Sequence, residues 1–92
     1  MNTENSQWFV YLLRCNDNSL YAGVTTDIKR RVKEHNNSSL GAKYTRVRRP
    51  VTLAYVEQAI SRSDACQKEY KLRKLPKKVK EKKVDTFLSH TI

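Results

Sequence analysis

The chain has 92 residues and carries 19 Lys and Arg against 9 Asp and Glu, a net charge of +10. This length allows one domain with a modest core, and no apolar run approaches the ~20 residues of a membrane-spanning helix. The N-terminal residues do not form a signal peptide pattern. We therefore expect a cytoplasmic domain, and this location includes the nucleoid. We also expect two free thiols and no obligate protein partner. The charge favours nucleic acid as the partner, ahead of an anionic membrane surface.

Residues 8–35 predict a strand, a turn, a second strand and a helix. The run WFVYLL is apolar, β-branched and aromatic, which is typical of a strand buried on both faces. The turn formers NDNS follow it, and LYAGV then predicts the second strand of a hairpin. Thr26 or Asp27 is the expected N-cap of a helix that continues to about His35. We place the domain at residues 8–88, after a disordered polar segment at 1–7.

This first helix has polar residues on its inward side. Ile28 and Val32 mark the buried stripe, and Arg31 and His35 fall on the same side. An inward arginine either snorkels from the edge of the stripe or lies in a cleft with a partner. His35 is either a satisfied histidine at the helix edge or a group that relays a proton or orients a phosphate.

Residues 36–50 predict a long loop that ends at Pro50, and such a loop in a small domain is usually functional or mobile. Tyr44 lies between Lys43 and Arg46. It either stacks on a base or sugar beside phosphate contacts, or packs the loop onto the core. Residues 51–57 then predict a third strand because apolar and small residues alternate there.

A second helix is predicted from Asp64 to Lys74, capped by Ser61 or Ser63. Glu69 lies inside its expected inward stripe, which consists of Ala65, Cys66 and Leu72. An inward carboxylate either holds a salt bridge or has a functional role. Pro76 suits the first turn of a last helix. The predicted order is β-β-α-β-α-α, an α+β domain with a three-stranded antiparallel sheet flanked by helices.

Several of these residues form a recognisable set. FVY ends at Tyr11, YAG begins at Tyr21, and Arg31 follows the second tyrosine at the same spacing. His35 lies one helical turn further on, and GAKYTR at 41–46 precedes the third strand. Over about residues 8–83 the sequence resembles the GIY-YIG nuclease domain. It is most similar to the small standalone bacterial members, which are related to the N-terminal domain of the excision-repair excinuclease.

The resemblance implies a metal-dependent endonuclease that hydrolyses phosphodiester bonds in structured, damaged or single-stranded DNA during repair or recombination. It implies Tyr11 or Tyr21 as the general base, of which we favour Tyr11, and a phosphate-binding role for Arg31. His35 completes the predicted catalytic set. Glu69 corresponds to the glutamate that binds Mg²⁺ or Mn²⁺. If both tyrosines serve one site, they must project from the same face of the sheet.

Two alternatives to the nuclease stay open. One is a nucleic-acid-binding module that has kept the fold and lost turnover, and the other is a basic structural protein bound to RNA or ribosomes. All three interpretations use the basic clusters at 29–33, 43–49 and 71–83, and the resemblance favours DNA over RNA. The residues expected to contact nucleic acid are Lys29, Arg30, Lys33, Lys43, Tyr44, Arg46, Arg48, Arg49, Lys71, Arg73 and Lys74.

Overall fold

The computed structural model describes residues 7–90. Its elements are β1 (Trp8–Arg14), β2 (Leu20–Thr25), α1 (Ile28–Asn37), α2 (Lys43–Arg46), β3 (Thr52–Ala59), α3 (Arg62–Lys74) and α4 (Lys77–Ser89). The predicted α+β class and three-stranded antiparallel sheet are confirmed, with β1 between β2 and β3. Apart from Gln7, the N-terminal segment that we expected to be disordered lies outside the described residues.

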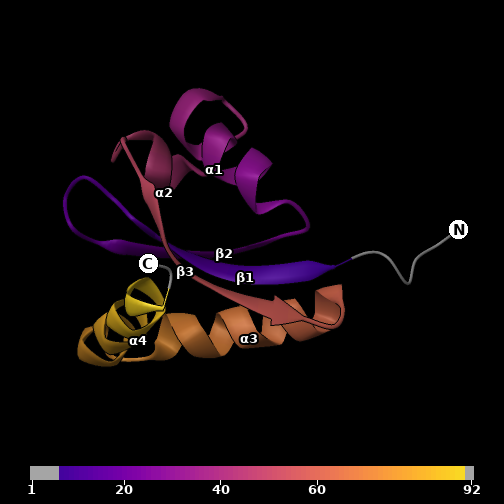
Figure 1. Ribbon diagram of the computed structural model, residues 1–92. Coiled ribbons are helices and arrows are strands. Elements are labelled where there is room, and N and C mark those ends of the chain that lie inside the picture. Colours follow the sequence, from indigo (N-terminus) through magenta and orange to yellow (C-terminus); the bar gives the residue numbers. More distant parts are fainter. Residues whose placement is uncertain (1–6, 91–92) are drawn as a thin grey trace, which may run out of the picture.

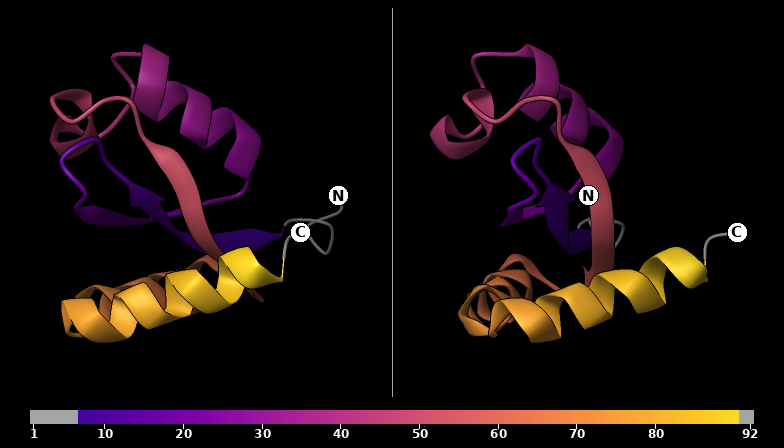
Figure 2. Two further views of the ribbon diagram at one scale, coloured as in Figure 1. Left: turned by 60° about the vertical axis from the view of Figure 1, so that its left-hand side comes forward. Right: turned by 90° about the vertical axis from the view of Figure 1, so that its left-hand side faces the viewer.

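The sheet lies between two pairs of helices. Helices α1 and α2 cover one face, and α3 and α4 cover the other (Figures 1 and 2). Because side chains alternate along a strand, Val10 and Leu12 of β1 join a core with Leu72 of α3. Tyr11 and Leu13 join a second core on the α1 side. The central strand is thus buried on both faces, which explains its unbroken apolar sequence.

The hairpin register places the two motif tyrosines on one face. Tyr11 is paired with Gly23, and Leu13 is paired with Tyr21. Tyr11 and Leu13 are two residues apart, so their side chains and that of Tyr21 share the α1 side of the sheet. The connection at residues 15–19 has an odd length, as the shared face requires. The prediction that Tyr11 and Tyr21 lie on the same face is confirmed.

Both helix starts are capped by one of the residues predicted for them. The Asp27 carboxylate accepts a hydrogen bond from the Arg30 backbone N–H at 3.0 Å. The Ser61 hydroxyl accepts one from the Asp64 backbone N–H, also at 3.0 Å. Ser61 therefore caps α3, and that helix begins two residues before the predicted start. Across residues 7–90, no helix is both long enough and apolar enough to cross a membrane.

The structure differs from the sequence prediction between residues 36 and 50. We expected a loop, but α1 continues to Asn37 and the one-turn helix α2 follows. Helix α2 has no apolar periodicity of its own, and its Thr45 is fully buried. Tertiary contact therefore stabilises this turn rather than local propensity. A second correction concerns Cys66, which is exposed rather than inward because the buried stripe of α3 contains Ala65 and Leu72.

Candidate functional site

Tyr11 lies in the centre of the sheet, with its ring packed over a glycine. A β-carbon added at Gly23 would be 2.4 Å from the Tyr11 hydroxyl oxygen and 2.6 Å from the ring carbon that carries it. Any side chain at this position would therefore displace the tyrosine. The glycine of the YAG sequence has a direct steric purpose, because it gives the Tyr11 ring room to cross β2.

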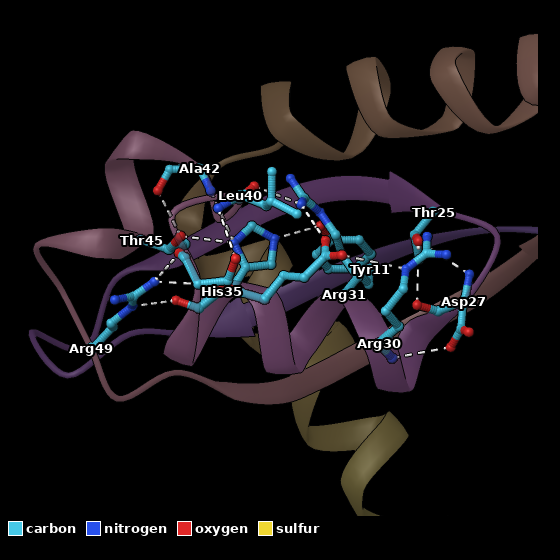
Figure 3. Close-up of polar contacts among 12 residues, drawn as sticks. Tyr11, Thr25, Asp27, Arg30, Arg31, His35, Leu40, Ala42, Thr45 and Arg49 are labelled. Atoms are coloured by element: carbon cyan, nitrogen blue, oxygen red, sulfur yellow. Dashed lines mark hydrogen bonds and ion pairs between the residues drawn. The ribbon is translucent and has the colours of Figure 1, made fainter.

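His35 connects this tyrosine to the segment around α2. The imidazole is fully buried, with Nε2 2.8 Å from the Tyr11 hydroxyl and Nδ1 2.7 Å from the Thr45 hydroxyl (Figure 3). The ring edge of Tyr21 also approaches the imidazole, at 5.5 Å between centroids. Three of the predicted catalytic residues, Tyr11, Tyr21 and His35, are thus brought together on one side of the sheet.

The hydrogen bonds of Thr45 indicate which atoms donate and which accept in the series Tyr11–His35–Thr45. Its hydroxyl donates to the Ala42 carbonyl at 2.9 Å, which leaves a lone pair on the oxygen to accept Nδ1–H of His35. The Ala42 backbone N–H donates to Nδ1 at 3.4 Å, a longer bond that belongs to the other tautomer. With the proton on Nδ1, the free lone pair of Nε2 accepts the hydroxyl proton of Tyr11. In that tautomer His35 can take a proton from Tyr11.

A second glycine brings the α2 segment against His35. A β-carbon at Gly41 would lie 2.7 Å from the Glu34 carbonyl oxygen and 2.9 Å from the His35 Cα. Both neighbours are backbone atoms that cannot move aside, so this close approach requires glycine. Sequence reasoning missed Thr45 and the purpose of Gly41. The signal for both was the GAKYTR sequence. In this segment without apolar periodicity, Gly41 precedes Thr45 by four positions.

Burial sets the protonation state of the site. Desolvation, followed by the positive charge of Arg31, lowers the pKa of His35 to about 4. Desolvation raises the pKa of Tyr11 to about 12, although the neighbouring Arg31 guanidinium opposes this shift. At neutral pH the imidazole is therefore neutral and the phenol is protonated. Transfer of the Tyr11 proton to His35 requires further positive charge near the phenol oxygen.

We expect His35 to make the protein sensitive to mild acid. Its folded pKa, about 4, lies below the ordinary value of 6.5, so the unfolded chain binds a proton first as the pH falls. The free energy of unfolding should then decrease by about 3 kcal/mol between pH ~6.5 and ~4. Urea unfolding at several pH values measures this slope.

H35Q should be less stable at neutral pH, and its loss of stability between pH ~6.5 and ~4 should be smaller. An unchanged slope in H35Q would contradict the assignment.

Arg31 extends from α1 beside the two tyrosines. Its Nη1 donates to the Glu34 carboxylate at 2.8 Å and to the Leu40 carbonyl at 2.9 Å, and the side chain remains 26% exposed. Its charge acts on both phenols, because it opposes the rise in the pKa of Tyr11 and of Tyr21. The arginine is therefore held at the edge of the tyrosine pair, where an anionic group could reach it. The ion pair with Glu34 is the partner that an inward arginine requires.

Glu69 belongs to α3, on the other side of the sheet from α1. Its carboxylate forms an ion pair with Arg73 at 3.0 Å, and its side chain is 21% exposed. It also raises the pKa of Tyr21, after the larger effect of burial. Tyr21 on the edge strand β2 therefore lies within the electrostatic reach of both Arg31 and Glu69. The salt bridge predicted as one alternative for Glu69 is present.

The Glu69 carboxylate is a ligand of the type that hard divalent ions accept. Within the described part of the chain, no group of three or more His, Cys, Asp or Glu side chains could hold a metal ion. Both ring nitrogens of His35 are engaged in hydrogen bonds, so the imidazole is not a free ligand. A single carboxylate suits Mg²⁺ or Mn²⁺, because magnesium commonly keeps water and substrate phosphate as most of its ligands.

Tyr44 packs against the site from α2. Its ring stacks on Tyr21 at 5.7 Å between centroids, and the Arg48 guanidinium lies 3.8 Å from its ring centroid. Its hydroxyl donates to Ser19 at 2.8 Å, and Ser19 in turn donates to the Asp17 carboxylate, which also accepts from Arg48. These contacts fix the β1–β2 turn to α2 and support Tyr21. Tyr44 thus has the packing geometry that was one of its two predicted roles.

The other predicted nucleic-acid contacts differ in accessibility. Arg49 is half-buried and donates to the carbonyls of Glu34, His35 and Ser38 near the end of α1. It therefore has a structural task, and its contact with nucleic acid stays a prediction. Eight predicted contacts are exposed on both sides of the sheet, namely Lys29, Arg30, Lys33, Lys43, Arg46, Lys71, Arg73 and Lys74.

Comparison with known proteins identifies relatives of the same size class. The UPF0213 protein DP2720 of Desulfotalea psychrophila is 51% identical over 73 residues, which covers 79% of this chain and 66% of that protein. The UPF0213 protein YazA of Bacillus subtilis is 49% identical over 78 residues, 85% of this chain and 78% of that protein. The chain spans just under two thirds of the first relative and more of the second.

Solved structures show the same fold. The solution NMR structure of the protein EF2693 from E. faecalis has a TM-score of 0.59 at 41% identity, covering 91% of this chain and 88% of that one. That of the UPF0213 protein BH0048 from Bacillus halodurans has a TM-score of 0.54 at 41% identity, covering 87% and 84%. The family model for the GIY-YIG catalytic domain matches residues 7–83, a region that contains the tyrosine pair, Arg31, His35 and Glu69. The chain therefore belongs to the GIY-YIG catalytic domain family.

Proposed function

We propose that this protein is a metal-dependent endonuclease that hydrolyses phosphodiester bonds in DNA. The observation that carries the proposal is the buried hydrogen bond between the Tyr11 hydroxyl and Nε2 of His35. A neutral imidazole in this position can accept the tyrosine's proton as the tyrosine takes one from water. The match to the GIY-YIG catalytic domain and the net charge of +10 support the same conclusion.

In the proposed reaction, Tyr11 removes a proton from the attacking water while its own proton passes to Nε2 of His35. Thr45 keeps the imidazole in the required tautomer by accepting Nδ1–H. Arg31 binds the nonbridging oxygens of the scissile phosphate, where its guanidinium neutralises charge as the phosphorus becomes five-coordinate. Arg31 also lies close enough to Tyr11 to favour the phenolate.

Glu69 is the residue that would hold Mg²⁺ or Mn²⁺ in this proposal. When bound, the ion would neutralise phosphate charge and stabilise the leaving oxygen. While no ion is bound, the Glu69 carboxylate pairs with Arg73 at 3.0 Å. DNA that is branched, damaged or single-stranded, as handled in repair or recombination, is the proposed substrate class in the cytoplasm.

One observation favours a second candidate, a nucleic-acid-binding domain without turnover. Tyr11 is only 2% exposed, and its pKa is about 12. A phenol this buried and this weakly acidic is a poor base until charge is added near it. The two functions share the same basic surfaces, so they differ in cleavage and not in binding.

The test is a cleavage assay on single-stranded, duplex, nicked and branched DNA, with Mg²⁺, with Mn²⁺ and with a chelator. We expect metal-dependent cleavage of at least one substrate. R31A should lose cleavage and also bind DNA more weakly, because a cation at the phosphate is removed. R62A, a change at an exposed cation on α3 outside the predicted contacts, should retain cleavage. Binding without cleavage of any substrate would favour the second candidate.

A further inference from the structure

The positive charge is divided between the two helical layers. Residues 27–50, which include α1 and α2, contain eight Lys and Arg against two Asp and Glu. Residues 62–89, which form α3 and α4, contain ten against four. The sheet separates these layers (Figures 1 and 2). Nucleic acid bound at Arg31 on the α1 side therefore leaves much of the positive charge on α4 without a contact to phosphate.

A groove lies between β3 and α4, within this second basic layer. Tyr55 and Phe87 form its aromatic part, with their rings in an edge-on pair at 5.9 Å between centroids. Its volume is about 500 Å³, within the range of about 300–1,000 Å³ typical of small-ligand sites. Tyr55 is paired with Leu12 and belongs to the core on the α3 and α4 side. The groove is therefore on the opposite face of the sheet from Tyr11.

Cations border the groove and extend beyond it. Lys82 and Lys83 line it beside the aromatic rings, and Nζ of Lys83 lies 5.7 Å from the centroid of Tyr55. A neighbouring hollow shares Lys83 and adds Lys68 and Lys71. Glu57 also lines that hollow, but its charge is matched because it forms an ion pair with Lys68 at 3.0 Å. Lys82, Lys83 and Lys71 thus form a lysine path along the two adjoining hollows, which share Lys83.

We propose that the groove between β3 and α4 binds an unpaired nucleotide, with the base against Tyr55 and Phe87 and the flanking phosphates on the lysine path. Aromatic rings beside a run of cations are the combination that holds single-stranded nucleic acid, because every base has a face that can stack. Base pairs inside a duplex are stacked on their neighbours and cannot offer that face. This inference rests on the proposed function in that it names the substrate class, DNA with a single-stranded part.

Charge complementarity selects this occupant over others. A second copy of this chain would bring another basic surface to a groove bordered by Lys82 and Lys83, and like charges would oppose the contact. A single strand brings one negative charge with each nucleotide and an apolar base surface with each charge. The base then matches the aromatic rings of the groove, and the phosphate matches its lysines.

The test measures binding of a labelled oligothymidylate and of a blunt duplex of equal length, by fluorescence anisotropy in chelator so that no cleavage occurs. F87L removes the ring and keeps an apolar side chain. It should weaken oligothymidylate binding about fivefold or more, since stacking provides that much per base, and leave the duplex Kd unchanged. K82A should weaken oligothymidylate binding more than K78A, because Lys78 is exposed on the same helix outside the groove. Thermal unfolding confirms that each variant is folded.

Equal Kd values for F87L and the unchanged protein, or equal losses on single strand and duplex, would overturn the proposal. So would a change in sedimentation without any change in oligothymidylate binding, which would show the groove to be a contact between copies. Because these measurements need no catalysis, a selective loss in F87L supports the groove even if no DNA is cleaved. Cleavage together with normal oligothymidylate binding in F87L would instead retain the nuclease and reject the groove.

Discussion

Replacing Glu69 by glutamine is expected to reduce metal-dependent DNA cleavage by a factor on the order of 10²–10³, because a bound metal ion stabilises the transition state by several kcal/mol. The amide keeps the shape of the side chain and removes the charge that would attract a divalent cation. DNA binding should persist or become tighter, because a negative charge close to the phosphate has gone. Cleavage rates across a metal titration, with Kd measured in chelator, give both values.

The variant R73Q separates this role from the salt bridge. It removes the ion pair of Glu69 and leaves the carboxylate in place. An exposed pair between residues four apart on a helix contributes only about 0.3–0.5 kcal/mol, so both variants should remain folded. If Glu69 serves only the ion pair, E69Q and R73Q should cleave saturating DNA at similar rates, and R73Q alone should bind DNA more weakly because it also removes a predicted contact. Full cleavage activity in folded E69Q would falsify the metal role.

Replacing Tyr11 by phenylalanine should produce a loss of similar size. The change removes the hydroxyl that bonds to His35 at 2.8 Å and keeps the ring over Gly23. Loss of a general base typically costs a factor of about 10²–10⁴ in rate. Stability should fall by about 1–3 kcal/mol, because Nε2 of His35 is left buried without its partner. Cleavage rates under single-turnover conditions, together with urea unfolding, measure the two effects.

Two further tyrosine variants complete this test. Y55F removes a hydroxyl that bonds to Glu57 at 2.9 Å on the other face of the sheet, so it should retain cleavage. Y21F removes a hydroxyl whose pKa responds to the charge of Glu69, and it should bind DNA normally. If Y11F is active and Y21F is inactive, the general base is Tyr21 and His35 only supports the fold.

Much of this fold follows from local sequence. The unbroken apolar run of β1 indicated a strand buried on both faces, and helices packed on both sides of the sheet explain it. Asp27 and Ser61 were both among the predicted caps, because a side-chain oxygen at a helix start satisfies an N–H of the first turn. The spacing of Tyr11, Tyr21 and Arg31 indicated the family before any contact was known.

Other features depended on contacts between residues far apart in the chain. The α2 turn was predicted as loop because its helicity comes from the burial of Thr45 against His35, a contact that no local pattern encodes. Cys66 was predicted to lie in the buried stripe of α3, next to Ala65. Successive side chains on a helix point in very different directions, so the position of the sheet decides which of the two is covered.

Composition, strand pattern and motif spacing were enough to predict the fold class, the two motif tyrosines and the excess of positive charge. The folded structure was needed to assign a task to each polar group. It assigned Arg49 to the carbonyls near the end of α1, placed Tyr44 on Tyr21, and gave His35 its two partners. The physical reason is that hydrogen bonds and pKa values depend on atoms within a few ångströms, and folding brings those atoms together from distant parts of the chain.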